Sequence, residues 1–480
     1  MKPTVNIIGA GPGGCQAALR LAQLGAQVNL MERDAVGGTC LNWGCIPTKA
    51  LKATADCLEM AKRGAEFGLT GLGSPAVDLP RAMARKNQVV EVNRAGVEKL
   101  LAAWGVRLIM GKARVVSANL VEVETPKGEV QGYRAGKLLV ASGAKSAGLP
   151  GLVRDGLKIM GSDDALCLTQ APGRLLVVGG GVVGCEFAQI FAAFGSQVTI
   201  VEALDRLLPL PGLDPATSKL LLREMKKRRI KAHLEAVVSS CQADGKEVTL
   251  QLGPSPLVEN SRFKLMELKA DLVLLAVGRK PAGDQLGLEN AGVTVSGRGL
   301  VPVDQRLATV NPDVYAIGDC LGAGRPMLAH MATAEALAAA ENILGGNRRV
   351  DYRVVPSVAF TSPETAWVGM SQAEAKSQGI DAVAHEFPFR QLGKAQAMGE
   401  IAGQSLLVSE DKTGRLLGAQ IIGPHAADLI HECALALKMG ATIDDLAHTI
   451  HAHPTLAEGV AEAAHLALGA CLHAPPGGKA

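Results

Sequence analysis

A glycine-rich turn that occurs twice in this chain constrains its fold more than any other feature. The first copy contains Gly9, Gly11 and Gly14, which follow the apolar stretch VNII and precede the helical pattern CQAALRLAQLG. A second apolar stretch, QVNLMER, then brings Glu32. In such a unit the glycines allow a tight turn, the helix N-terminus receives a pyrophosphate, and the acid binds ribose hydroxyls. The sequence therefore predicts a dinucleotide site formed by these four residues.

The second copy lies in the segment RLLVVGGGVVGCEFAQIFAAFGSQVTIVE, which begins at Arg174. It retains Gly179, Gly181 and Gly184 in the turn and Glu202 at the end of the second strand. A duplicated fold with a vestigial second site is the alternative, but a decayed copy need not keep all three glycines and the acid. We therefore expect two dinucleotide sites in one chain.

Glu202 also indicates which dinucleotide the second site accepts. A carboxylate at this position repels a 2′-phosphate, and the next residues, Ala203 and Leu204, supply no arginine to bind one. The sequence thus favours NAD over NADP. Arg206 is the residue that would reverse this preference.

Length and composition indicate a chain of several domains. Its 480 residues exceed what one hydrophobic core usually organises, and 48% hydrophobic with 20% charged residues is typical of soluble globular proteins. The formal net charge of +3 is too small to indicate nucleic acid or anionic lipid as a partner. The start MKPTVNIIGAGPGG has no signal-peptide pattern, and no apolar stretch reaches membrane-spanning length. We expect a cytoplasmic protein that does not bind a membrane.

The segment GGTCLNWGCIPTKAL, residues 37–51, brings Cys40 and Cys45 close together. Zinc would need four ligands and no second cysteine pair of suitable spacing exists, so we expect no metal; a buried structural pair is the other alternative. The redox interpretation is favoured because Pro47 marks a helix start, where the helix dipole lowers the pKa of a thiol. We expect this effect at Cys45, with Lys49 adding a positive charge one turn along.

The remaining cysteines are too sparse for a disulfide scaffold, since the whole chain has only ten. We expect most of them to be buried and to act as small hydrophobic residues. They are Cys15, Cys57, Cys167, Cys185, Cys241, Cys320, Cys433 and Cys471.

The segment around the two cysteines resembles the GGxCLNxGCIPxKAL signature of the class I flavin disulfide reductases, and the resemblance extends over essentially the whole chain. It implies that the first dinucleotide site holds FAD and the second NAD. It further implies that Cys45 lies against the flavin, that Cys40 exchanges with substrate, and that Lys49 lies near the reactive nitrogen of the flavin. Thr39 is counted among the cofactor contacts.

Shorter landmarks resemble the same family. The stretch ASGA returns the chain from the FAD domain, AVGR lies near the nicotinamide cofactor, and VYAIGD carries the aspartate that binds the ribityl chain of the flavin. The stretch MLAH lies beneath the isoalloxazine ring by the same resemblance. These landmarks add the expected cofactor contacts Ser142, Gly143, Gly278, Arg279, Asp319, Met327, Leu328, Ala329 and His330. Taken alone, Asp319 is equally suited to cap a helix.

A cluster of histidines stands near the C-terminus, in HTIHAHPTLAEGVAEAAH. Taken alone it fits a metal site or a polar helix start, although no cysteine or extra carboxylate completes a ligand set. HPTLxE resembles the catalytic segment of the family, in which the histidine is the acid/base and the glutamate fixes it. This implies that His453 and Glu458 are catalytic, with His451 as a neighbour, and that the histidine comes from the partner chain of a homodimer.

These observations lead to one expected architecture and function. We predict an α/β fold with two Rossmann-like dinucleotide-binding domains, a central segment and a C-terminal α+β dimerisation domain. The expected limits are 1–145 for FAD, 146–276 for NAD, 277–347 for the central FAD-contacting segment and 348–480 for the interface domain. The resemblance implies oxidation of the dihydrolipoyl group of a carrier protein, through Cys40 and Cys45 and FAD, to NAD.

Two alternatives stay open at this point. The enzyme could reduce another disulfide, or the chain could be a non-catalytic flavoprotein subunit that binds a lipoyl carrier. Two positions depart from the family pattern: Trp43 lies between the cysteines, and Gly283 stands where Asn or Thr is common. Trp43 is expected to narrow the approach to the dithiol.

Overall fold

The computed structural model describes residues 3–322 and 324–473. It divides into two compact units, of which the first comprises Met1–Leu51, Asp78–Ala147 and Gly278–Tyr352. The second comprises Lys52–Val77, Gly148–Val277 and Arg353–Ala480. Each unit is described by itself.

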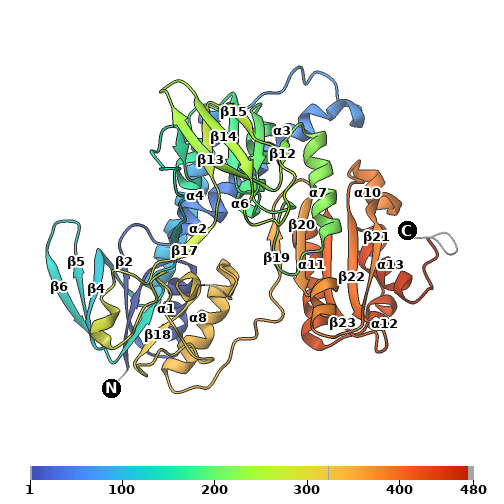
Figure 1. Cartoon of the computed structure of the whole chain (residues 1–480). Helices are drawn as coiled ribbons and strands as arrows, with labels where there is room; N and C mark the ends of the chain where they lie inside the picture. Colours follow the sequence, from blue (N-terminus) through green and yellow to red (C-terminus); the bar gives the residue numbers. More distant parts are fainter. Residues whose placement is uncertain (1–2, 323, 474–480) are drawn as a thin grey trace. The chain divides into compact units, whose positions relative to one another are not determined.

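The first unit, to which the elements labelled β2, β18, α1 and α8 in Figure 1 belong, is built on a parallel sheet of five strands in the order β18-β7-β1-β2-β3. Its helices α1 (Pro12–Gln23) and α8 (Ala329–Ile343) pack against each other. The strands are β1 (Thr4–Ile8), β2 (Gln27–Glu32), β3 (Arg107–Met110), β7 (Lys137–Val140) and β18 (Val314–Ala316). Parallel neighbours need crossover connections, and α1 supplies the one between β1 and β2.

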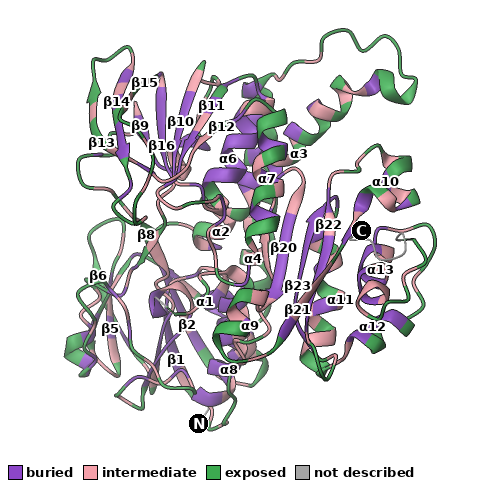
Figure 2. Cartoon of the chain, turned by 45° about the vertical axis from the view of Figure 1, so that its right-hand side comes forward, coloured by how far each residue is buried: buried purple, intermediate pink, exposed green. Residues whose placement is uncertain are grey.

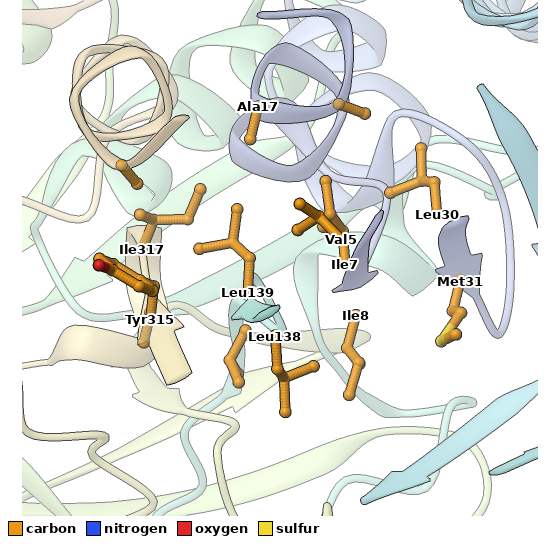
Figure 3. Packing of buried hydrophobic residues seen from close by; sticks show 14 of the residues in the cluster. Val5, Ile7, Ile8, Ala17, Leu30, Met31, Leu138, Leu139, Tyr315 and Ile317 are labelled. Carbon is orange, nitrogen blue, oxygen red and sulfur yellow. The ribbon is translucent and has the colours of Figure 1, made fainter. Parts of the chain in front are cut away.

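Alternation along these strands places apolar side chains on both faces of the sheet. In Figure 3, Ile7 and Leu139 point toward the side of Ala17 on α1, whereas Ile8 and Leu138 point to the opposite side. All five are buried, because a parallel sheet is covered on both faces. The carboxyl ends of both strands are therefore held in place. The first glycine turn begins directly after β1, and Glu32 is the last residue of β2.

Smaller elements complete the first unit. An antiparallel sheet is formed by β4 (Lys112–Ser117), β5 (Leu120–Glu124) and β6 (Val130–Arg134), and a two-stranded sheet by β8 (Ala144–Ser146) and β17 (Arg279–Pro281). The helices are α2 (Gly38–Trp43), α4 (Leu79–Ala103), η2 (Leu288–Ala291) and η3 (Gly318–Leu321). Helix α3 (Cys45–Lys62) begins in the first unit and continues into the second, where η1 (Gly64–Phe67) follows it.

The second unit contains another parallel sheet of five strands, in the order β12-β11-β10-β16-β9. Its strands are β9 (Ile159–Met160), β10 (Arg174–Val178), β11 (Gln197–Val201), β12 (Lys231–His233) and β16 (Leu272–Leu275). Its helices are α5 (Ser162–Ala165), α6 (Val182–Ala193) and α7 (Pro215–Lys227). An antiparallel sheet accompanies it, made of β13 (Ala236–Ala243), β14 (Val248–Pro254) and β15 (Met266–Ala270).

The C-terminal part of the second unit is an antiparallel sheet of five strands in the order β19-β20-β23-β22-β21 (Figure 2). Its strands are β19 (Ser357–Ala359), β20 (Glu364–Gly369), β21 (Ala382–Pro388), β22 (Gln404–Glu410) and β23 (Leu416–Gly423). Its helices are α9 (Gln372–Ser377), η4 (Phe389–Gln391), α10 (Gly393–Met398), α11 (Ala426–Met439), α12 (Ile443–His448) and α13 (Glu458–Ala467).

The two faces of this sheet belong to different hydrophobic clusters. Leu407 and Ile421 pack with residues of α11, α12 and α13, whereas Leu406 and Leu417 pack with Ala375 of α9. This period-two alternation is what a sheet covered on both faces requires. The predicted fold class is therefore confirmed: two Rossmann-like sheets precede an α+β domain. Among the described residues, no helix is long and apolar enough to cross a membrane.

Candidate active site

The first glycine turn is shaped by steric limits at two of its glycines and left open at the third. Gly9 has a φ of +103°, and a Cβ there would collide with the carbonyl oxygen of Ala141. A Cβ on Gly14 would collide with the carbonyl oxygen of Gly9. Gly11, by contrast, has nothing within 4 Å of the position of a Cβ. The turn thus packs tightly beneath the helix and leaves space at the N-terminus of α1, where a pyrophosphate would be received.

Glu32 ends β2 beside this turn, with its carboxylate bound by backbone N–H groups. Its Oε2 atom accepts a hydrogen bond of 2.7 Å from the N–H of Ala10, and its Oε1 atom accepts from Arg33 and Asp34. Glu32 is 8% exposed. A buried carboxylate supported by backbone donors has a fixed orientation, which suits the recognition of ribose hydroxyls.

The second turn repeats this geometry. A Cβ on Gly179 would collide with the carbonyl oxygen of Ala276, one on Gly184 would collide with that of Gly179, and Gly181 again faces open space. Glu202 accepts a 2.6 Å hydrogen bond from the N–H of Gly180 through Oε2. Both turns therefore fit a dinucleotide by the same test.

Arg206 does not pair with Glu202. Its Nη1 atom lies 3.8 Å from Oδ1 of Asp205, and its Nε atom is buried without a hydrogen-bond partner. Glu202 instead uses its second oxygen to accept from the N–H of Leu204 at 2.8 Å. Backbone donors thus hold both oxygens of Glu202, and its proposed selection against the extra phosphate of NADP stays a prediction.

The two cysteines lie where α2 and α3 meet. Cys40 is half-buried on α2, and Cys45 is exposed and is the first residue of α3. Both are thiols, and the pKa of Cys40 is raised by its hydrogen bond with Cys45 and by burial, with Lys49 acting in the opposite direction. The pair therefore disfavours the thiolate form of Cys40. The expected low pKa of Cys45 itself stays a prediction.

The start of α2 is attached directly to the first glycine turn. The N–H of Gly37 donates a 2.7 Å hydrogen bond to the carbonyl oxygen of Ala10. A Cβ on Gly38 would lie 2.7 Å from the Cα atom of Gly11. Only glycine allows this approach, so the cysteine-bearing helix is held against the turn that would bind the dinucleotide.

A second group of predicted cofactor contacts gathers around Arg279. Its Nη2 atom lies 3.4 Å from Oγ1 of Thr39 and also donates to the carbonyl oxygen of Ala144. Burial raises the pKa of Asp319, and the charge of Arg279 opposes that rise. Ser142 lies two residues before Ala144 in the sequence, and its side chain hydrogen-bonds the buried thiol of Cys320, which opposes the rise that burial gives to the pKa of that thiol.

The remaining predicted flavin contacts lie at the start of α8. Met327 and Leu328 are half-buried, Leu328 is the N-cap residue of the helix, and Ala329 is its first residue. His330 follows and is exposed. Gly143 and Gly278 both have positive φ values, of +68° and +99°. The structure places these residues in the first unit, and their contacts with a cofactor stay predictions.

One buried polar cluster beside the predicted site residues was not predicted from the sequence. Glu335 lies on α8 and is 2% exposed. Its carboxylate accepts a hydrogen bond of 2.6 Å from the N–H of Gly318 and one of 2.7 Å from the hydroxyl of Tyr352. Arg325 donates to the same hydroxyl at 3.0 Å. The cluster holds the start of η3 and thereby Asp319. Its one sequence signal is an acid in the alanine-rich stretch AHMATAEALAAA.

The histidine segment lies in the second unit between α12 and α13. Nδ1 of His453 lies 2.8 Å from Oε1 of Glu458, whose other oxygen accepts 2.8 Å from the N–H of Thr455. Burial raises the pKa of Glu458, but the hydrogen bonds from His453 and Thr455 outweigh it, so that the pKa is lowered. The carboxylate therefore stays ionised and orients the imidazole, leaving Nε2 to accept a proton.

His451 makes a different pair. Its Nε2 atom lies 2.8 Å from Oε1 of Glu432 on α11, and its Nδ1 atom lies 2.8 Å from the carbonyl oxygen of Thr449. Both partners are acceptors, an arrangement that favours the form of the ring with a proton on each nitrogen. The hydrogen bond with Glu432 raises the pKa of His451 accordingly. A hollow of about 380 Å³ lies beside this segment, lined among others by His451, Glu458 and His465.

The predicted site residues thus form three groups. The first unit holds the first glycine turn with Glu32, the two cysteines with Lys49, and the residues around Asp319. The second unit holds the second turn with Glu202 and, on its C-terminal sheet domain, His451, His453 and Glu458. Within the described residues there is no cluster of three or more side chains suited to bind a metal.

Comparison with family models shows to which protein family the chain belongs. The model described as pyridine nucleotide-disulphide oxidoreductase matches residues 3–336, and the dimerisation domain of the same family matches residues 355–464. The chain belongs to the pyridine nucleotide-disulphide oxidoreductases. The predicted relation to flavin disulfide reductases is therefore confirmed, and so are its cofactors, FAD and NAD.

Relatives of this oxidoreductase match it over nearly its full length. Dihydrolipoyl dehydrogenase of Haloferax volcanii is 40% identical over 470 residues, covering 97% of this chain and 96% of the relative. Dihydrolipoyl dehydrogenase of Geobacillus stearothermophilus is 39% identical over 469 residues, with coverage of 97% and 96%. The crystal structure of LpdA from Mycobacterium tuberculosis matches with a TM-score of 0.87 at 26% identity, covering 97% of this chain and 99% of that one. The flavoprotein disulfide reductase RclA from Escherichia coli, as a Cu(II) complex, matches with a TM-score of 0.84 at 29% identity and covers 97% and 99%.

Proposed function

We propose that this oxidoreductase oxidises the dihydrolipoyl group of a carrier protein and reduces NAD, using Cys40 and Cys45 as its redox pair. The observation that carries the proposal is the packing of α2: Gly37 and Gly38 hold this cysteine-bearing helix against the first dinucleotide turn. A dithiol in that place is suited to exchange electrons with the cofactor of that turn. The curated relatives named dihydrolipoyl dehydrogenase support the choice of substrate.

The sulfur chemistry begins with Cys40 and Cys45 joined as a disulfide. One thiolate of the dihydrolipoyl group attacks the Cys40 sulfur, which breaks the Cys40–Cys45 bond and forms a mixed disulfide. The second lipoyl sulfur then attacks the first, which closes the lipoyl ring and breaks the bond to Cys40. The Cys40 sulfur leaves with the proton of the second lipoyl thiol and becomes a thiol. Two electrons have moved to the protein, and the raised pKa of Cys40 supports its being the thiol of the product pair.

His453 supplies the proton transfer that this exchange needs, because thiolates and not thiols attack disulfides. We propose that Nε2 of His453 takes the proton of the lipoyl thiol, while Nδ1 stays bound to Glu458. An imidazole suits this task because it titrates near neutral pH. Glu32 and Glu202 would hold the ribose groups of FAD and NAD, and these cofactors would supply the electron transfer from the dithiol to the nicotinamide.

The assembly and location form part of the same proposal. The match of residues 355–464 to the dimerisation domain supports a homodimer, and we propose that His453 acts on the dithiol of the partner subunit. We propose a cytoplasmic location because ten cysteines in 480 residues are too few for a disulfide scaffold. His451 is proposed as a neighbour of the base rather than as the base, since both of its ring nitrogens are engaged.

The proposal is tested by mixing FAD-loaded protein with dihydrolipoamide and following nicotinamide reduction with NAD and, in parallel, with NADP. We expect turnover with NAD and a much slower rate with NADP. Cys40→Ser and Cys45→Ser should each abolish turnover and retain bound FAD. Cys167→Ser is the matched control, because Cys167 is exposed and lies outside the predicted site residues.

Two results would contradict this proposal, and a third would refine it. Turnover with another disulfide but not with dihydrolipoamide would change the substrate, and Trp43 would then be examined as the cause. Flavin that no dithiol can reduce would indicate a non-catalytic subunit. Turnover that appears only with a lipoylated carrier domain, and not with free dihydrolipoamide, would support the carrier and assign specificity to the docking surface.

A further inference from the structure

Ala10, the second residue of the first glycine turn, is held at both of its polar backbone groups. Its N–H donates to Oε2 of Glu32 at 2.7 Å. Its carbonyl oxygen accepts from Sγ of Cys15 at 3.0 Å and from the N–H of Gly37 at 2.7 Å. Cys15 lies one turn into α1 and is 4% exposed.

The second dinucleotide site has the same arrangement at Gly180. Its N–H donates to Oε2 of Glu202 at 2.6 Å. Its carbonyl oxygen accepts from Sγ of Cys185 at 3.2 Å and from the N–H of Leu208 at 2.8 Å. Cys185 is fully buried. The duplicated fold has thus placed a thiol, a backbone donor and an acid around the equivalent residue twice.

The residue that follows is the one that faces open space. Gly11 and Gly181 are the N-cap residues of α1 and α6, and neither has an atom within 4 Å of the position of a Cβ. Within the part of the chain that the structure describes, neither N–H donates to a protein acceptor. Because a peptide unit is planar, the direction of the Ala10 carbonyl fixes the direction of the Gly11 N–H, and Gly180 does the same for Gly181.

Both thiols are able to donate at neutral pH. Burial raises the pKa of Cys15 to about 12, and the nearby charge of Glu32 also raises it. Burial and Glu202 raise the pKa of Cys185 in the same way. A protonated thiol is a weak but real hydrogen-bond donor, and each of these two thiols, besides packing in the core, donates to a carbonyl group.

We propose that Cys15 and Cys185 are positioning residues of the FAD and the NAD site, each of which orients, through the preceding carbonyl, the N–H group at Gly11 or Gly181 that receives the pyrophosphate. Cys15 acts on a carbonyl that it shares with Gly37, so it also steadies the attachment of α2. The inference rests on the two cofactors and not on which disulfide the enzyme oxidises. Its failure is therefore distinguishable from failure of the proposed substrate.

The test compares Cys15→Ala, Cys15→Ser, Cys185→Ala and Cys185→Ser in the full-length protein. FAD affinity is measured by titrating the apoprotein with FAD and following flavin fluorescence. NAD affinity is measured by calorimetry on FAD-loaded protein. Each variant serves as the control for the other site, and melting temperatures report on general damage.

We expect each alanine variant to weaken its own nucleotide about 3-fold, because one weak hydrogen bond is lost while the backbone donor to the same carbonyl remains. Cys15→Ala should leave the NAD dissociation constant unchanged, and Cys185→Ala should leave the FAD constant unchanged. The serine variants keep a donor and should restore binding. The KM for NAD of Cys185→Ala should rise with little change in kcat.

Other outcomes would overturn the proposal. Alanine variants that bind both nucleotides as the wild type does would remove the role of the thiols. Serine variants as weak as the alanine variants would show that packing and not hydrogen bonding matters. Equal weakening of both nucleotides by either substitution would indicate general destabilisation. If an alanine variant does not fold, the serine variant decides alone, and a loss of about tenfold or more in its own nucleotide would contradict the proposal.

Discussion

Nδ1 of His453 lies 2.8 Å from Oε1 of Glu458. The same carboxylate accepts from the N–H of Thr455, so its position is fixed by the backbone before it meets the ring. This arrangement selects the tautomer that carries its proton on Nδ1. The other ring nitrogen, Nε2, is then the one that can accept a proton, and the site need not change its shape.

Replacing the carboxylate by an amide tests this relationship. We expect Glu458→Gln to lower kcat about 10-fold to 100-fold, since an amide cannot stabilise the imidazolium that forms when His453 takes a proton. The KM for NAD should not change. Steady-state rates with dihydrolipoamide would measure both quantities.

Glu462 offers a matched control one turn along α13. Its Oε1 atom lies 2.7 Å from Nδ1 of His473, so it makes the same kind of pair outside the proposed base. Glu462→Gln should retain the wild-type rate. A loss equal to that of Glu458→Gln would mean that both variants act by disturbing α13.

The glycines of the two turns should separate folding from binding. Gly181→Ala places its Cβ in open space and costs the fold little, but it fills the room at the helix N-terminus. We expect at least about tenfold weaker NAD binding with FAD retained and an unchanged melting temperature. Gly393→Ala is the control, because Gly393 also has nothing within 4 Å and lies on the C-terminal sheet domain. Loss of NAD binding in the control as well would refute the steric explanation.

The buried network around Glu335 should contribute to stability. Glu335→Ala removes the acceptor of the Gly318 N–H and of the Tyr352 hydroxyl, which should lower the free energy of unfolding by about 2 kcal/mol. Release of FAD should accompany it, because η3 carries Asp319. Urea unfolding with flavin release as a second signal measures both effects.

A control for Glu335 lies on the same helix. Glu341 pairs with Arg20 and Arg348 near the surface, at 29% side-chain exposure. Such exposed pairs contribute little, so Glu341→Ala should cost less than about 1 kcal/mol. Equal losses in the two variants would point to helix propensity instead of the buried network.

The pair of His451 and Glu432 should give stability that depends on pH. The pKa of His451 is raised in the folded protein, so the contribution is complete below the ordinary value of 6.5 and is lost as the pH rises through the folded pKa. The melting temperature of the wild type should therefore exceed that of Glu432→Gln most at pH values below 6.5. The difference in melting temperature should shrink toward alkaline pH. It corresponds to at most about 1 kcal/mol in the free energy of unfolding after solvent screening. A gap that widens with rising pH would contradict the assignment.

Much of this site could be predicted because its signals are local. Gly9, Gly14 and Glu32 follow one another within a single strand, turn, helix and strand, and each is needed for a steric or hydrogen-bonding reason that a short stretch of sequence expresses. The cysteine pair is local in the same sense. The family, the fold class and the two cofactors were correct on these grounds.

Contacts between distant segments could not be predicted in this way. His451 meets Glu432 on another helix, and Tyr352 meets Glu335 across a loop, and no motif joins either pair. Knowing these pairs requires knowing how α11 and α8 pack. The four predicted domain limits stay predictions, and in the structure residues 52–77 group with the second compact unit.

The eight cysteines outside the predicted redox pair show how far burial can be predicted from composition. Four of them, Cys15, Cys185, Cys320 and Cys433, are buried as expected. Cys57 and Cys167 are exposed, contrary to that general expectation, and Cys241 and Cys471 are half-buried. Burial was thus predicted for the right reason at half of these positions, but the hydrogen bonds of Cys15 and Cys185 depend on the path of the turn above them.

The close backbone contact between Gly38 and Gly11 affects how the protein unfolds on heating. Because no side chain separates the two backbones, the glycine turn cannot open without releasing α2, and α2 cannot detach without uncovering the turn. Escape of the nucleotide and disorder of the cysteines are then a single cooperative event. On heating, the protein would pass from intact to inactive with no intermediate that keeps its cofactor and has lost its dithiol.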